Sequence, residues 1–230
     1  MLQRKFRGLA IFILITLALC VLSAPNAVAD SLTYDLISQN GALTGSGPYV
    51  QVTINLTSST MATVTFDSLD TNGYTYLMSS NGAADINVNA ASFTLSGLTF
   101  SNSIAGFSAG PVVDDGSKNI STFGTFNQTT KGGAGFTNSS TEISFTLTDI
   151  SGTWSSAANV TTPNNDGQIL GAHGFECKDP CTTTEGAANT GYVSDAVLVP
   201  EPSSSSLIGA LGVGLFGFGL LRRRLPAFSE

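Results

Sequence analysis

Positively charged residues are scarce in the central part of this chain, and this scarcity restricts its possible partners more than any other feature of the composition. Residues 30–199 contain no arginine and only three lysines against fourteen aspartates and glutamates, which gives this body a formal charge of −11. Because nucleic-acid binding requires lysine or arginine to neutralise phosphates, the sequence excludes a nucleic-acid partner. Docking to anionic lipid is disfavoured for the same reason.

Charge of either sign is scarce. Charged residues make up 11% of the chain, against a typical share of about 25%. The surface must therefore be built mainly from serine, threonine, asparagine and glycine, which suits a cell-surface or matrix protein. A body of about 170 residues corresponds to one ordinary domain, large enough to bury a core without a disulfide scaffold.

Histidine occurs once, at His173. As a general base it would need a nucleophile and an orienting acid, and the sequence contains no nucleophile-elbow glycine-serine motif. A Ser-His-Asp hydrolase is therefore disfavoured. We expect His173 to be a loop residue with its ring against neighbouring backbone, and we expect no enzymatic activity and no cofactor.

Cysteine is almost as rare. Cys20 belongs to the N-terminal apolar segment, so Cys177 and Cys181 are the only cysteines of the body. In an oxidising compartment, two cysteines this close predict a disulfide that closes a tight loop. The alternative is a zinc site, for which the ligands would be His173, Cys177, Cys181 and either Glu176 or Asp179. Its spacing is not that of a standard zinc site, and we expect no metal.

Paired carboxylates are the remaining catalytic option, because two of them can flank a glycosidic bond. Asp67 with Asp70 and Asp114 with Asp115 are the candidate pairs. Asp67 follows Phe66 on the outer face of a predicted strand, and residues 114–116 have the composition of a turn. We expect both pairs to be solvated charges and predict no catalytic residue.

Residues 164–167 (Asn-Asn-Asp-Gly) are similar to part of a calcium loop. Thr162 stands where the first acidic ligand belongs, and no glutamate occupies the closing position. A hairpin turn is the better interpretation, with a low-affinity Ca²⁺ site at the acidic loops left open.

No window of the body has a helical stripe, whereas period-two alternation is common. Residues 49–57 and 141–149 alternate strictly between apolar and polar side chains, as half-buried strands do. Weaker alternation occurs at 62–66, 74–78, 86–88, 93–100 and 192–198. Turn signals occur at Asn72-Gly73, Asn81-Gly82, Asp115-Gly116 and Asp166-Gly167. The pattern predicts an all-β ectodomain, an antiparallel β-sandwich or jelly roll. The Gly-rich stretch 106–135 gives no clear strands.

The positions of the aromatic side chains distinguish a β-sandwich without a sugar-binding face from a carbohydrate-binding module. Trp154 is expected to anchor the core, where its indole N–H needs one hydrogen-bond partner. Sugar binding would instead require an exposed, coplanar aromatic strip, drawn from Tyr49, Tyr74, Tyr76, Trp154 and Tyr192. Alternation places Tyr74 and Tyr76 on the same face, so they are the first candidates for such a strip.

The N-terminal segment, residues 1–29, has the three parts of a signal peptide. Arg4, Lys5 and Arg7 form a positive region, residues 9–22 an apolar region, and Ala27-Val28-Ala29 an Ala-x-Ala cleavage site. We predict a signal-peptide helix that is removed on export, leaving Asp30 as the mature N-terminus.

The C-terminal segment, residues 199–230, forms a second address signal. Pro200-Glu201-Pro202 is followed by four serines, a Gly-rich apolar run over 207–221 and Arg222-Arg223-Arg224. A membrane-spanning helix needs about 20 apolar residues, so this run with the serines is a marginal transmembrane helix. The arginines are expected to stay cytoplasmic. An ordinary single-pass anchor that is never cut is the alternative.

These residues resemble the sorting signal of the PEP-CTERM family, the proposed substrates of exosortase in Gram-negative bacteria. The resemblance implies export, recognition by a membrane-embedded cysteine transpeptidase, cleavage near Pro200-Glu201-Pro202, and association with exopolysaccharide or the biofilm matrix. Residues 73–78, 124–129 and 151–154 also resemble segments of an uncharacterised ectodomain of that family, which implies no activity.

The sequence thus predicts a signal peptide over 1–29, a β-sandwich ectodomain over 30–198 and a sorting signal over 199–230. We expect a non-enzymatic protein of the cell surface or the extracellular matrix, with exosortase as processing partner. Before cleavage, the C-terminal helix would hold it in the inner membrane. The alternatives are a carbohydrate-binding module that takes exopolysaccharide and, less favoured, a secreted glycan-active enzyme.

Overall fold

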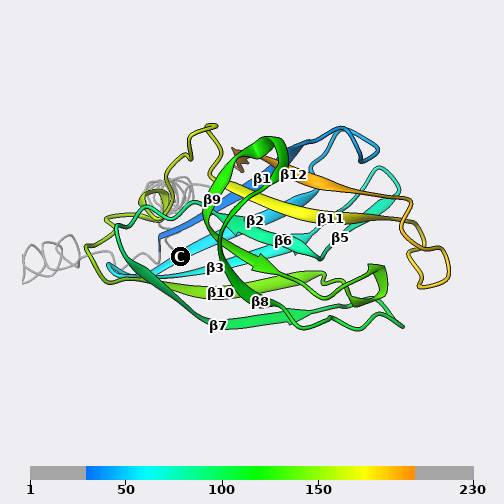
Figure 1. Ribbon diagram of the computed structural model, residues 1–230, viewed down its shortest axis with the longest axis horizontal. Helices are drawn as coiled ribbons and strands as arrows, with labels where there is room; N and C mark the ends of the chain where they lie inside the picture. The colour runs from blue at the N-terminus through cyan, green and yellow to red at the C-terminus, as the bar shows by residue number, and fades with distance from the viewer. Residues whose placement is uncertain (1–29, 200–230) are drawn as a thin grey trace, which may run out of the picture.

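The computed structural model describes residues 30–199, and in this range the chain is built from β-strands and three short 3₁₀ helices (Figure 1). The first six strands are β1 (Asp30–Gln39), β2 (Val50–Ser58), β3 (Met61–Ser68), β4 (Asp70–Thr71), β5 (Tyr74–Met78) and β6 (Asn81–Ile86). The others are β7 (Phe93–Ser101), β8 (Val113–Asn119), β9 (Thr125–Lys131), β10 (Glu142–Asp149), β11 (Leu170–Lys178) and β12 (Asn189–Leu198). The 3₁₀ helices are η1 (Ser121–Phe123), η2 (Phe136–Asn138) and η3 (Ala157–Asn159).

The strands form one antiparallel sheet in the order β7-β10-β3-β2-β1-β12-β11-β6-β9-β8, with β5 paired to β11 and β4. The sheet curls until it nearly closes, because Met78 at the end of β5 bridges Ser140 just before β10 through two backbone hydrogen bonds of 2.9 and 2.8 Å. The predicted antiparallel all-β class is confirmed. The sequence favoured a sandwich of two sheets, whereas the described strands form one continuous sheet that packs against itself.

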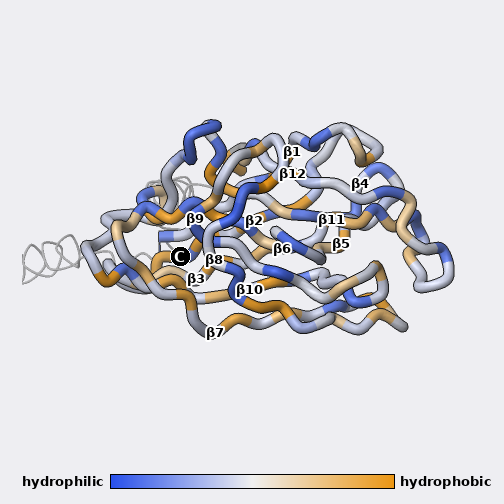
Figure 2. The backbone as a smooth tube through the Cα atoms, in the orientation of Figure 1, coloured by the Kyte–Doolittle hydropathy of each residue, from blue (hydrophilic) through white to orange (hydrophobic). Residues whose placement is uncertain are grey.

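The core fills the interior of this curled sheet and follows the alternation of the sequence, which is visible along the strands in Figure 2. Val52 and Ile54 of β2 belong to the same cluster as Ile143 and Leu147 of β10, and all four are 0% exposed. Their neighbours in sequence point outward and are polar. The period of two therefore identified the buried face of both strands correctly.

Strand bounds were predictable where alternation was strong. The structure confirms strands at 49–57, 62–66, 74–78, 93–100, 141–149 and 192–198, within one to three residues at most ends. The prediction of a strand at residues 86–88 is wrong, because β6 ends at Ile86. Five strands were missed: β1, the two-residue β4, β8, β9 and β11. β11 is covered on both faces and contains Gly171 and Gly174, so it has no polar face to reveal it.

The turn signals had mixed outcomes. Asn72 and Gly73 have φ of 56° and 76° and join β4 to β5, as expected of an Asn-Gly turn. Residues 164–167 also form a turn, in which the Gly167 N–H donates to the Asn164 carbonyl at 3.0 Å. The turn predicted at residues 114–116 is wrong, because these residues lie inside β8 where its register with β9 shifts.

The outer face of β6, β11 and β12 is covered by a small second cluster. Ile120, Phe123 and Phe126, around η1, are at most 8% exposed and pack with Tyr192 of β12. Gly171 of β11 lies directly beneath, since a Cβ there would come within 3.2 Å of the Phe126 ring. This cover buries groups that alternation alone would place in solvent.

Candidate functional site

His173 lies in strand β11, so the predicted loop position is wrong. Its Nδ1 lies 3.0 Å from the Ser79 carbonyl and its Nε2 lies 2.9 Å from Thr190 Oγ1. The ring centroid is 4.4 Å from that of Tyr192. Burial lowers the pKa of His173, opposed by the hydrogen bond to Ser79. Both ring nitrogens are thus engaged within the fold, and the ring contacts backbone as expected.

The predicted disulfide joins Cys177 and Cys181, whose Cα atoms are 5.3 Å apart. Both sulfur atoms are bonded to each other, so neither is available as a thiolate ligand for zinc. Glu176 is buried on the opposite face of β11, where its Oε2 accepts a hydrogen bond from the Thr44 N–H at 2.7 Å. Within residues 30–199 no group of three or more histidine, cysteine or acidic side chains is arranged to hold a metal ion.

The four carboxylates of the two candidate pairs have different surroundings in the fold. Asp67 lies on β3 opposite Glu142 of β10, and burial, together with the charge of Glu142, raises the pKa of Asp67. Asp70 lies on the short strand β4 and is exposed. On β8, Asp114 Oδ1 accepts a hydrogen bond from Gln128 Nε2 at 2.9 Å.

Asp115, the other aspartate of β8, forms an ion pair with Lys118 at 3.5 Å. The two aspartates of β8 thus have different partners.

Asp85 was missed by the sequence analysis and is the most unusual ionisable residue of the described chain. It lies on β6 opposite Gly171 of β11 and Thr129 of β9, and it is 0% exposed. Among residues 30–199, its two carboxylate oxygens are buried without a hydrogen-bond partner, as is Thr129 Oγ1. Burial raises the pKa of Asp85 well above its usual value, and the charge of Asp115 adds to the effect.

The exposed aromatic strip is not formed. Tyr49, Tyr76 and Trp154 are at most 2% exposed, and the Tyr49 and Tyr76 rings pack edge to face at 4.9 Å. Tyr74 and Tyr192 are half-buried. Trp154 is the expected core anchor, and its Nε1 donates to the Asn89 carbonyl at 2.9 Å. None of these five side chains is fully exposed, so they do not form the predicted flat platform for sugar.

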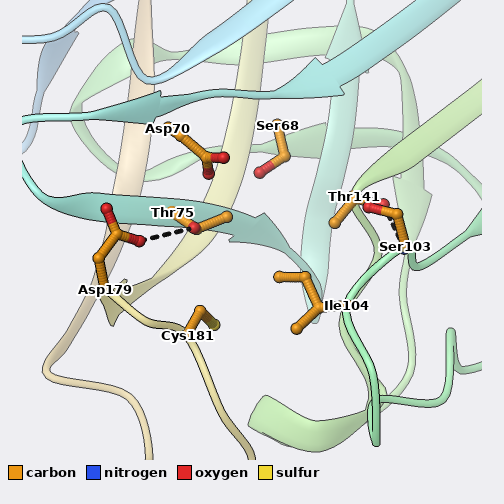
Figure 3. Close-up of a pocket in the computed structure, with 8 residues that line it drawn as sticks. All are labelled: Ser68, Asp70, Thr75, Ser103, Ile104, Thr141, Asp179 and Cys181. Atoms are coloured by element: carbon orange, nitrogen blue, oxygen red, sulfur yellow. Dashed lines mark hydrogen bonds between the residues drawn. The ribbon is translucent and has the colours of Figure 1, made fainter.

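A polar cavity of about 270 Å³ lies beside the disulfide loop (Figure 3). Asp70, Ser68 and Thr75 line one side in the figure, and Ile104 and Cys181 lie opposite. The Thr75 hydroxyl donates to Asp179 Oδ1 at 3.4 Å. The remaining lining residues are Ser103 and Thr141. The cavity thus offers hydroxyls, two carboxylates and one aliphatic side chain.

The ends of the described chain lie on neighbouring strands. β1 begins at Asp30, and β12 ends at Leu198 opposite Tyr34. The Val199 N–H still donates to the Thr33 carbonyl at 2.9 Å. No helix within residues 30–199 has the length and apolar character of a membrane span. The residues predicted to form the signal peptide and the sorting signal lie outside the described residues: Arg4, Lys5, Arg7, Ala27, Ala29, Pro200, Glu201, Pro202, Arg222, Arg223 and Arg224.

Comparison with known proteins identifies this C-terminal segment. A search of curated proteins and a search of solved structures gave no match. A family model, the PEP-CTERM protein-sorting motif, matches residues 198–224, which begin at the last residue of β12. The chain therefore carries a PEP-CTERM sorting signal, the mark of an exported protein that exosortase sorts at the membrane of Gram-negative bacteria.

Proposed function

We propose that this chain is a non-enzymatic protein of the cell surface or extracellular matrix, which exosortase delivers and processes at its C-terminus. The observation that carries this proposal is the sorting motif at 198–224, placed immediately after the last strand of the ectodomain. The ectodomain is then the cargo, and its surface chemistry determines what it does after delivery.

A non-enzymatic role is supported by how the ionisable side chains are used. The nitrogens of His173 are bonded to Ser79 and Thr190. Asp114 and Asp115 have partners of their own. Asp85 is sealed beneath the cluster around η1. A general acid–base pair must reach the substrate together, whereas these groups are hydrogen-bonded or ion-paired within the fold or, in the case of Asp85, buried.

The outward side chains support a structural role in a hydrated matrix. Along β2 and β10 the outward residues are mostly neutral and hydroxylic or amidic, for example Gln51, Thr53, Ser144 and Thr146. Cross-strand hydroxyl pairs stabilise such a surface, as Thr65 and Ser144 do at 3.0 Å. A surface of this kind holds water and hydrogen-bonds to glycans without a strong field, which fits adhesion, packing or water retention in exopolysaccharide.

Replacing Pro200-Glu201-Pro202 with three alanines is expected to stop removal of the tail while the ectodomain stays folded, because the motif lies beyond the last strand. Intact-mass spectrometry of the protein from its host measures this: the wild type should run from Asp30 to near Pro202, and the variant should retain the tail. Alanines at Ser204-Ser205-Ser206 are the matched control. A variant that is processed like the wild type would refute the sorting role of the motif.

Binding of a single sugar unit is a second candidate function, favoured by the cavity beside the disulfide loop. Its volume of about 270 Å³ lies just below the usual range of small-molecule sites, about 300–1,000 Å³. Carboxylates accept hydrogen bonds from sugar hydroxyls, and Ile104 supplies an apolar contact. Without an aromatic platform, affinity should be weak.

The double variant Asp70→Asn, Asp179→Asn is expected to weaken the binding of host exopolysaccharide oligosaccharides at least tenfold. Each bond to a charged acceptor contributes roughly 1.5–3 kcal/mol. Titration followed by NMR of the ectodomain measures this, with Asp166→Asn in the exposed 164–167 turn as control. Unchanged shifts at Thr75 and Ser103 on adding oligosaccharide to the wild type would eliminate the candidate.

A further inference from the structure

The last four described residues, 196–199, are paired with a neighbouring strand on one side only, and we call them the terminal strip. The pairing of β12 with β11 runs from Asn189 to Val193. Its pairing with β1 runs from Val193 to Leu198 and continues through the Val199–Thr33 hydrogen bond. Beyond Val193, therefore, β1 is the sole paired neighbour of this strand among the described residues.

An irregular backbone conformation within β12 separates the terminal strip from the part of the strand that is paired with β11. Asp195 has φ of 54°, a left-handed conformation that is uncommon for a residue with a side chain. Its N–H donates to Gln168 Oε1 at 2.9 Å. The preceding Ser194 is 0% exposed and donates to the Leu170 carbonyl. The chain is thus fixed up to residue 195, and the terminal strip is held by the ladder to β1 and by the packing of the small Ala196 side chain against the core.

The terminal strip also directly precedes the processing motif in the sequence. Val199 is still hydrogen-bonded to β1, and the next residue is Pro200. One extended residue spans at most about 3.6 Å, so no spacer separates Pro200-Glu201-Pro202 from the edge of a folded sheet. An enzyme that cuts near the motif must enclose several residues of extended peptide, and the sheet occupies the space on their N-terminal side.

We propose that the terminal strip is a release segment: it unpairs from β1, hinging at Asp195, so that the sorting enzyme can enclose the motif. This inference rests on the proposed function. Four released residues give up to about 14 Å of additional reach. Release uncovers Ala196, whose small side chain packs against the core, and Leu198, which is already 53% exposed.

A reversible crosslink tests the proposal in the full-length chain. Thr33 and Val199 face each other across the hydrogen-bonded ladder, where Cα atoms are about 5.5 Å apart, within the range of about 4.4–6.8 Å that a disulfide spans. In the double variant Thr33→Cys, Val199→Cys, the oxidised protein should lose its tail at least tenfold more slowly than the same protein after reduction. The wild type with and without reductant controls for the native Cys177–Cys181 bond. Equal rates in the oxidised and reduced forms would overturn the proposal.

Insertion of a spacer provides a second test of the proposal. Inserting Gly-Ser-Gly-Ser between Val199 and Pro200 should restore processing of the oxidised protein to within about twofold of the reduced one, because the enzyme no longer needs the strip. Continued slow processing would contradict the release mechanism.

Amide exchange of the purified protein separates this inference from the proposed function, because it needs no enzyme. The amide of Val199, which donates to the Thr33 carbonyl, should exchange at least tenfold faster than that of Val193. Equal protection would overturn the release segment even if the tail is removed normally. If the Val199 amide exchanges fast but the tail is never removed, the inference about the release segment stands and the proposed sorting function is refuted.

Discussion

Trp154→Ala is expected to lower the free energy of unfolding by about 3–5 kcal/mol, the range for truncating a large buried aromatic residue. Trp154 is 2% exposed, and its N–H donates to the Ser59 carbonyl at 2.7 Å while Nε1 donates to the Asn89 carbonyl. The residue therefore joins the β2–β3 turn to the segment after β6. Loss of the side chain opens a cavity and leaves the Asn89 carbonyl without this donor.

Urea unfolding of the ectodomain followed by circular dichroism measures this change, because the chain has no other tryptophan to report fluorescence. Trp154→Phe is the matched control: it retains an aromatic ring but not the donor, and should lose roughly 1–3 kcal/mol. A loss below about 1 kcal/mol in Trp154→Ala would show that the indole is not a core anchor.

Asp85→Asn is expected to stabilise the protein by about 1–3 kcal/mol at pH 8, because the neutral amide spares the folded state the cost of burying a carboxylate or of binding a proton at that pH. In the wild type, burial and then the charge of Asp115 raise the pKa of Asp85. The folded state therefore binds a proton that the unfolded state releases above about pH 4. Stability due to this group is full below that pH and falls as the pH rises through the folded-state pKa.

Unfolding titrations between pH 4 and pH 8 should consequently show a smaller decline for Asp85→Asn than for the wild type. Asp67 contributes a decline of the same sign, since its pKa is also raised, and it cancels in the comparison. Glu185→Gln, which removes one exposed negative charge, should follow the wild type. Identical pH slopes for Asp85→Asn and the wild type would mean that Asp85 is ionised and solvated in the folded protein.

The difference between Asp85 and Asp67 shows the limit of reading sites from sequence. Both are aspartates within β-strands, and nothing in their neighbouring residues sets them apart. Asp85 is buried because the segment from Ile120 to Phe126, far along the chain, covers that face of β6. Burial of a strand's second face depends on what packs over it, which is a long-range property. The Gly-rich composition of 106–135 concealed this cover.

Properties encoded in short stretches were determined by the sequence. The sorting signal at 198–224 is a linear motif, and the alternation of β2, β3 and β10 follows from local pleating. The disulfide followed from the presence of two cysteines, four residues apart, in an exported body. Such features need no knowledge of distant partners.

The tertiary structure alone decided which strands are neighbours and therefore what each end of the chain can do. Pairing of β1 with β12 joins residues more than 150 positions apart and brings the first and last strands of the ectodomain together. That pairing, and the end of the β11 ladder at Val193, leave residues 196–199 paired on one side only, directly before the motif. Backbone hydrogen bonds are the same at every position, so the choice of partner depends on how the whole sheet buries its core.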